Sequence, residues 1–116
     1  MITEFGKELR KLRLDLGITL FDMAEKAGVS SSLLSSAETG KKPASPALVD
    51  KLAQAFPAVQ ARKPHFASLA AMTTGEVRIR LSSEREKANA AALAFARKFE
   101  SFSDTQFDDL MKIFNK

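Results

Sequence analysis

Apolar residues recur at helical spacing over most of this chain. The first series predicts a helix that begins after Thr3 and is stopped by Gly17. Its apolar positions are Phe5, Leu9, Leu12 and Leu16. The same spacing returns in residues 46–56, where a serine and a proline suit a helix start, and over a shorter stretch in residues 64–72. The pattern predicts a mainly helical protein.

The stretch from the first helix to Gly40 predicts two short helices joined by a tight turn. Thr19 is placed to cap the first of them, and Asp22 follows at the position that completes a capping box. Gly28 supplies the backbone freedom that a sharp turn needs, and Ser30 is placed to cap the second helix. Two short helices with such a turn between them are typical of a DNA-reading motif.

Residues 76–82 change the period, because polar and apolar residues alternate strictly there. This alternation predicts one half-buried β-strand, with Val77, Ile79 and Leu81 on its buried face. No second strand is evident, and a lone strand leaves backbone donors and acceptors unpaired at both edges. We therefore expect the same strand of a second subunit to pair with it across a two-fold axis.

Two further helices are predicted after this strand, and capping-box signals at residues 83–86 and 103–106 open them. Their apolar stripes are Ala88, Ala91, Ala92, Phe95 and Phe99 in the first and Phe107, Leu110, Met111 and Phe114 in the second. We interpret the phenylalanines as core or dimer packing, with Phe95 and Phe99 as candidate dimer contacts. The alternative is a groove that holds a partner protein.

Composition narrows the classes of function. A chain of 116 residues that is 45% apolar suits one small domain, or a small domain with an oligomerising segment. It contains no cysteine, so disulfides and thiolate metal sites are excluded, and its single histidine, His65, argues against metal or His-based catalytic chemistry. We expect no enzyme, cofactor or metal. No apolar run approaches the roughly 20 residues that cross a bilayer, so we expect a cytoplasmic protein without a membrane partner.

The net charge of +4 is compatible with nucleic-acid binding, but it is not concentrated in the paired short helices. Residues 1–56 are nearly balanced, and the excess lies in residues 57–82. Arg78 and Arg80 belong to this excess. They either lie on the solvent-exposed face of a paired strand and keep it soluble, or belong to a β-ribbon that contacts DNA or an acidic partner.

Residues 5–56 resemble the XRE-type helix-turn-helix family, the phage-repressor and Cro-like transcription regulators. The residues that carry the resemblance are Ala24, Gly28, Val29, Ser30, Leu34, Glu38 and Gly40, with Leu9, Arg10, Leu12 and Arg13 in the preceding helix. The resemblance implies that the helix of residues 31–39 enters the major groove of DNA. It also implies a partly shielded ion pair between Arg13 and Glu38, which ties the first helix to the end of the recognition helix.

The same resemblance implies roles at the DNA surface. The positions that face base edges are Ser31, Ser32, Ser35 and Ser36, where family members often carry arginine or glutamine. Serine pairs with almost any base and therefore discriminates weakly, so we expect groove shape to add to the sequence preference. The candidate phosphate contacts are Thr19, Lys41, Lys42 and Ser45. For the two lysines the alternative is an ordinary solvated turn.

These features predict a five-helix, repressor-like helix-turn-helix domain, followed by one β-strand and a C-terminal helical hairpin. We place the DNA-binding domain in residues 1–73 and the dimerisation segment in residues 74–116. The expected function is a homodimeric, sequence-specific transcription regulator, a repressor that binds an inverted repeat in double-stranded DNA. The alternative is an antitoxin-like protein whose C-terminal helices bind a second protein and whose DNA binding is autoregulatory. A helix-turn-helix that serves only as a packing unit is the remaining alternative.

Overall fold

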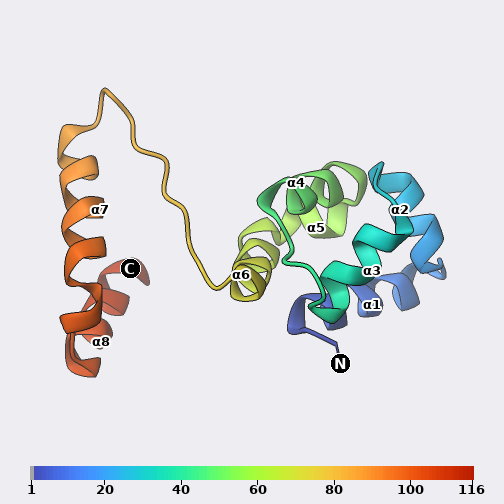
Figure 1. Ribbon diagram of the computed structural model, residues 1–116, viewed down its shortest axis with the longest axis horizontal. Helices are drawn as coiled ribbons and strands as arrows, with labels where there is room; N and C mark the ends of the chain where they lie inside the picture. Colours follow the sequence, from blue (N-terminus) through green and yellow to red (C-terminus); the bar gives the residue numbers. More distant parts are fainter. Residues whose placement is uncertain (1) are drawn as a thin grey trace. The chain divides into compact units, whose positions relative to one another are not determined.

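The computed structural model describes residues 2–116, which divide into two compact units with a boundary between Val77 and Arg78 (Figure 1). All regular secondary structure in this part of the chain is helical, which supports the expectation of a mainly α protein. None of these helices combines the length and the apolar character that crossing a lipid bilayer requires.

Helix α1 spans Glu4–Leu16, the range that its apolar spacing predicts. The Thr3 hydroxyl oxygen caps it by accepting a hydrogen bond from the Gly6 N–H at 3.0 Å. Gly17 ends it in the left-handed region, with φ 68°. Both ends of α1 are therefore fixed by residues within one helical turn.

Helix α2 spans Leu20–Ala27 and carries the capping box expected from the sequence. The Thr19 hydroxyl accepts from the Asp22 N–H at 3.0 Å, and the Asp22 carboxylate accepts from the Thr19 N–H at 3.1 Å. Gly28, with φ 76°, ends the helix and turns the chain into α3, which spans Ser31–Thr39. The backbone N–H groups of Thr19 and Asp22 are thus both hydrogen-bonded by side chains at the start of α2.

Three helices complete the first unit: α4 (Pro46–Ala55), α5 (Pro57–Ala61) and α6 (Lys63–Thr74). The Ser45 hydroxyl caps α4 by accepting from the Leu48 N–H at 3.2 Å. In Figure 1, α3 lies between the other helices of this unit; it packs against α1 and α2, while α4 packs against α2, α5 and α6. The largest fully buried apolar side chains are Phe5, Leu9, Met23, Leu34, Val49, Leu52, Phe56 and Val59.

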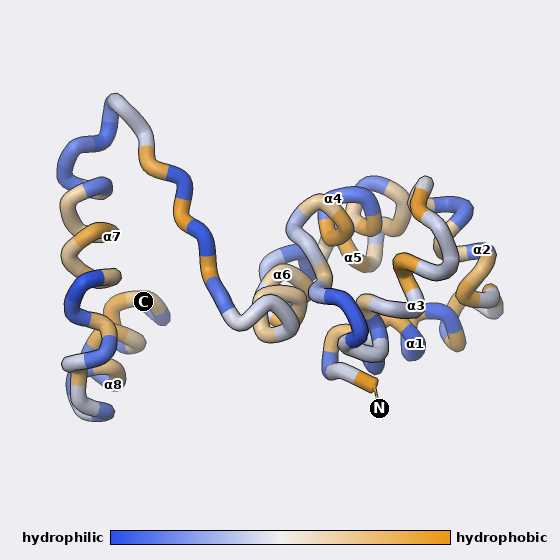
Figure 2. The backbone as a smooth tube through the Cα atoms, viewed as in Figure 1, coloured by the Kyte–Doolittle hydropathy of each residue, from blue (hydrophilic) through white to orange (hydrophobic). Residues whose placement is uncertain are grey.

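The expectation of a β-strand in residues 76–82 is wrong. Figure 2 shows the alternation of apolar and polar residues in this segment, but no strand occurs in residues 2–116. A strand needs backbone hydrogen bonds to a neighbouring strand, and alternation by itself supplies none. Val77 and Ile79 are 79% and 64% exposed, and Leu81 is 46% exposed, so they do not form the buried face of a sheet.

The second unit contains α7 (Glu86–Lys98), a 3-10 turn η1 (Phe99–Ser101) and α8 (Asp104–Phe114). The capping box expected at the start of α8 is present. The Ser103 hydroxyl accepts from the Gln106 N–H, and the Gln106 side chain accepts from the Ser103 N–H. The sequence signal therefore located the start of α8.

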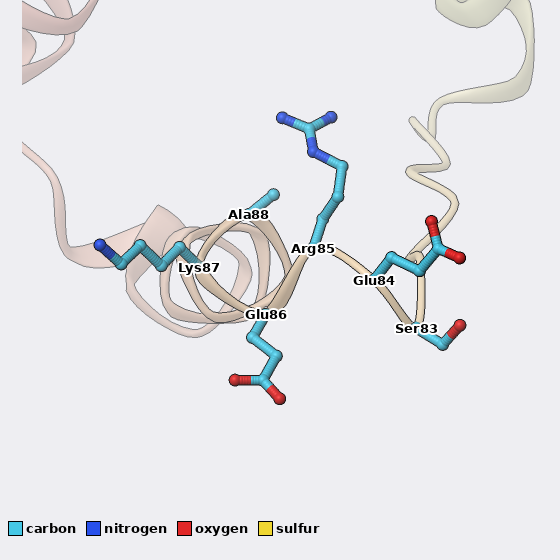
Figure 3. A pocket seen from close by; sticks show the side chains of 6 residues that line it. All are labelled: Ser83, Glu84, Arg85, Glu86, Lys87 and Ala88. Carbon is cyan, nitrogen blue, oxygen red and sulfur yellow. The ribbon is translucent and has the colours of Figure 1, made fainter.

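The capping box expected at residues 83–86 is absent. Helix α7 begins only at Glu86, and its N-cap residue, Arg85, makes no side-chain cap. Instead, the Asn89 amide bonds to the backbone of Ser82, donating to its carbonyl at 2.6 Å and accepting from its N–H at 3.0 Å. Figure 3 shows the side chains that line the shallow hollow at residues 83–88 pointing in different directions. They lack the convergent polar groups of a ligand site.

Aromatic rings join the two helices of the second unit. Phe95, Phe99, Phe102 and Phe107, which we call the ring cluster, form four neighbouring pairs with centroids 5.4–5.6 Å apart. None of residues 78–116, all of them described, is fully buried. Phe99, a member of the cluster, is 52% exposed. Met111 and Phe114, which follow Phe107 at helical spacing on α8, are 51% and 65% exposed, and we call these three residues the rim of the ring cluster.

Candidate nucleic-acid interface

The outward face of α3 carries four serines, Ser31, Ser32, Ser35 and Ser36, which we call the serine face, with the exposed Leu33 at its border. Leu34, Ala37 and Glu38 are buried on the inner face of the helix. On the outer side, Ser32 and Ser35 are exposed, and Ser31 and Ser36 are partly exposed. No hydrogen bond ties these four hydroxyl groups to another residue of the described chain, so each keeps its donor and acceptors for a ligand.

Local interactions fix both ends of α3. The Ser30 hydroxyl accepts from the Leu33 N–H at 3.0 Å, and Gly40 ends the helix with φ 80°. The Thr39 hydroxyl donates back to the Ser35 carbonyl at 3.0 Å. These contacts fix the start and the end of α3, and with them the position of the four serines on the protein surface.

Glu38, at the last turn of α3, holds the helix against α1. Both nitrogens of the Arg13 guanidinium fork donate to its carboxylate, Nη2 to Oε1 at 2.9 Å and Nη1 to Oε2. Arg13 is 8% exposed and Glu38 1%, so the pair is almost withdrawn from water. Arg10 lies on the solvent side, with Nε 3.8 Å from Oε1 of the same carboxylate. Because both charges are buried, each depends on the other for its stability.

The backbone of Glu38 is also bound to the start of α1. Its carbonyl accepts from the Thr3 N–H at 2.9 Å and from the Thr3 hydroxyl at 3.0 Å. Gly6 faces the same peptide so closely that a Cβ there would lie 2.9 Å from the Glu38 Cα and overlap its carbonyl oxygen. The sequence pattern did not reveal this contact. The available signal was a glycine inside a helix, which lowers helix propensity and therefore often has a packing reason.

We expect Gly6→Ala to lower the free energy of unfolding by about 1–3 kcal/mol, the usual cost of overpacking. The added methyl meets backbone atoms, which cannot rotate away as a flexible side chain does. Urea unfolding measures the change, with Lys7→Ala at the next, exposed position of α1 as the control. Equal stability of the Gly6 variant and the wild type would show that α1 and α3 do not approach this closely.

Lys41 and Lys42 follow Gly40, the residue that ends α3. Both are exposed, and neither ammonium forms an ion pair with a described residue. The Lys42 N–H donates to the Ser36 carbonyl at 3.2 Å, which keeps the turn on the C-terminal end of α3. Two uncompensated positive charges therefore border the serine face, while the only charged residue on α3 itself, Glu38, is buried.

The remaining two candidates, Thr19 and Ser45, are exposed N-cap residues. The hydroxyl oxygen of each accepts a backbone hydrogen bond, and each hydroxyl proton stays available for a phosphate oxygen. At Thr19 the neighbouring Asp22 carboxylate is already bound to the backbone N–H and adds negative charge. Ser45 carries no such carboxylate at its cap, so it is the more favourable phosphate donor of the two.

Comparison with known proteins identifies a family for the segment that contains these helices. The model of a family described as a helix-turn-helix domain matches residues 4–66, a range that holds α1 to α5 and the first residues of α6. No curated protein and no solved structure matches the chain significantly. The match confirms the helix-turn-helix segment implied by the resemblance and supports a DNA-binding role for it. The chain belongs to the helix-turn-helix domain family.

Proposed function

We propose that this protein is a homodimeric transcription repressor that occupies an inverted repeat in double-stranded DNA and inserts α3 into the major groove. The observation that carries the proposal is the serine face of α3 with two unpaired lysines at its end. The family match supports DNA binding by this segment. Repression rather than activation, and binding to an inverted repeat, go beyond the family match and are part of our proposal.

The shape of the serine face suits a groove. The major groove of B-DNA is about 12 Å wide and admits one α-helix. Short side chains such as Ser32 and Ser36 let the helix backbone come close to the base edges. Their free hydroxyls then donate to or accept from the bases.

The flanking groups suit the DNA backbone. Lys41 and Lys42 provide charge for phosphates next to the C-terminal end of α3, and Ser45 provides a hydroxyl donor at the start of α4. Contacts of this kind position a protein on the duplex without reading its sequence. Phosphate binding by the flanks and base reading by α3 thus fall on separate residues.

The second unit supports the dimer. Its 39 residues contain no fully buried side chain, and segments of about 40 residues rarely fold alone without oligomerisation or other cross-links. The exposed rim of the ring cluster, Phe99, Met111 and Phe114, is an apolar surface that a second copy would cover. Two copies would present two α3 helices to half-sites about 34 Å apart. In the antitoxin-like alternative, a different protein covers this rim instead of a second copy of the chain.

The salt dependence of binding tests the DNA interface. We expect Lys41→Ala combined with Lys42→Ala to weaken binding to all duplexes alike, because phosphate contacts release counterions without reading bases. Each lost contact reduces the slope of log affinity against log salt by about 0.9. Titration of fluorescent duplexes at several salt concentrations measures the slope.

The matched control removes the same charge elsewhere. Lys87→Ala combined with Lys98→Ala changes two exposed lysines of the second unit and is expected to leave the slope unchanged. An unaltered slope in the Lys41 and Lys42 variant would remove these residues from the interface. A wild-type protein that binds no duplex would contradict the proposed function itself.

A further inference from the structure

One apolar side chain on α3, that of Leu33, belongs neither to the buried core nor to the serine face. Leu34 and Ala37 are fully buried, whereas Leu33 is 39% exposed. Apolar surface in water is unfavourable, and a contact that covers it releases free energy in proportion to its area. A ligand that binds α3 and covers the exposed part of the Leu33 side chain would therefore gain binding free energy.

The residues beside Leu33 limit what α3 can recognise. Guanine and adenine are usually read by two hydrogen bonds from one arginine, lysine, asparagine or glutamine, and α3 has none of these residues. The serine hydroxyls distinguish bases poorly because they both donate and accept. The remaining distinctive group in the major groove is the C5 methyl of thymine, which is read by apolar contact.

Leu33 is well placed for such a contact. Residues three apart are neighbours on a helix surface, so Leu33 adjoins Ser36 at the border of the serine face. The other border is at Ser31, which lines a shallow hollow together with Phe21, 63% exposed, on α2. Ser31 and Leu33 lie about 200° apart around the helix, so Phe21 and Leu33 border different sides of the serine face.

We propose that Leu33 reads the C5 methyl group of a thymine, and that each half-site carries a thymine at this position. The inference rests on the proposed function and names the base that α3 prefers. It assigns base discrimination to an apolar contact beside the serines. It also predicts that hydrogen-bond patterns alone will not explain the operator.

Deoxyuridine substitution tests the assignment, because uracil keeps the hydrogen-bonding edge of thymine and lacks only the methyl group. The operator is first selected from random duplexes by the full-length protein, and each thymine is then replaced in turn. At one position per half-site we expect an affinity loss of about fourfold, which corresponds to ~0.8 kcal/mol for one buried methylene-sized group.

Variants identify the residue that makes the contact. In Leu33→Ala the thymine and uracil operators are expected to bind equally, while Leu33→Met keeps part of the preference because its side chain remains apolar. Leu14→Ala, which removes an 82% exposed leucine from α1, is the control and keeps the full preference. Thermal unfolding of each variant checks that the fold is intact.

The outcomes separate this inference from the proposed function. Failure to select any duplex contradicts the proposed function. A selected operator without thymine in its half-sites, or one in which no uracil substitution changes the affinity of the wild type, overturns the inference while DNA binding stands. Loss of the thymine preference in Phe21→Ala but not in Leu33→Ala also overturns it.

Discussion

Arg13→Ala is expected to lower the free energy of unfolding by about 3–5 kcal/mol, the usual cost of leaving one buried charge without its partner. The Glu38 carboxylate is 1% exposed and takes two hydrogen bonds from the Arg13 guanidinium. Arg10, 3.8 Å away on the solvent side, is a weak substitute because the side chain is half exposed. Urea unfolding followed by circular dichroism measures the loss.

Two comparisons show whether burial is the cause. Lys7→Ala breaks the exposed ion pair with Glu4 and is expected to cost less than about 1 kcal/mol. Arg13→Met combined with Glu38→Gln removes both charges and is expected to cost less than Arg13→Ala alone, since no buried charge is left. An Arg13→Ala variant as stable as Lys7→Ala would mean that water reaches Glu38.

Met111→Glu combined with Phe114→Glu is expected to convert the proposed dimer into a monomer. These residues are 51% and 65% exposed at the rim of the ring cluster, and a dimer contact there would bury the introduced carboxylates. A monomer holds one half-site at a time and loses the effective concentration of the linked second site. Affinity for the full inverted repeat should therefore fall by about 100-fold or more. Light scattering and DNA titration on one sample give both quantities.

Leu93→Glu is the matched control in the same unit. Leu93 is 51% exposed on α7 and lies about 200° around the helix from Phe95, so Leu93→Glu is expected to leave the proposed dimer intact. All four residues of the ring cluster are retained in every variant. A double variant that remains dimeric would place the contact elsewhere. A wild-type chain that purifies with a stoichiometric second protein would favour the antitoxin-like alternative.

The sequence predicted those helix ends that depend on residues within one turn. Thr19 with Asp22 located the start of α2, and Ser103 with Gln106 located the start of α8. These two ends could be read from the sequence because the cap and its partner are close in the chain. At residues 83–86 the same kind of signal failed, since Asn89 bonds to the backbone upstream and α7 begins later.

Features that depend on distant parts of the chain were not predictable in this way. The alternation in residues 76–82 describes two faces of a segment but not a partner for its backbone, and no strand forms there. The approach of Gly6 to Glu38 joins residues far apart in sequence and has no local pattern. The base-facing role of the serines on α3 came from the family resemblance and the phosphate-binding role of Lys41 and Lys42 from their charge, and these roles at DNA stay predictions.

The serine face has a consequence for how this domain changes over evolution. The side chains of Ser32 and Ser35 contribute no core packing and no hydrogen bond to the described chain, so substitutions there are expected to change stability by no more than about 0.5 kcal/mol. Arginine, glutamine and alanine also have higher helix propensity than serine. New operator preferences can therefore arise by single mutations on α3 without compensating changes elsewhere. The same property makes these positions suitable for a randomised library from which domains with chosen operators are selected.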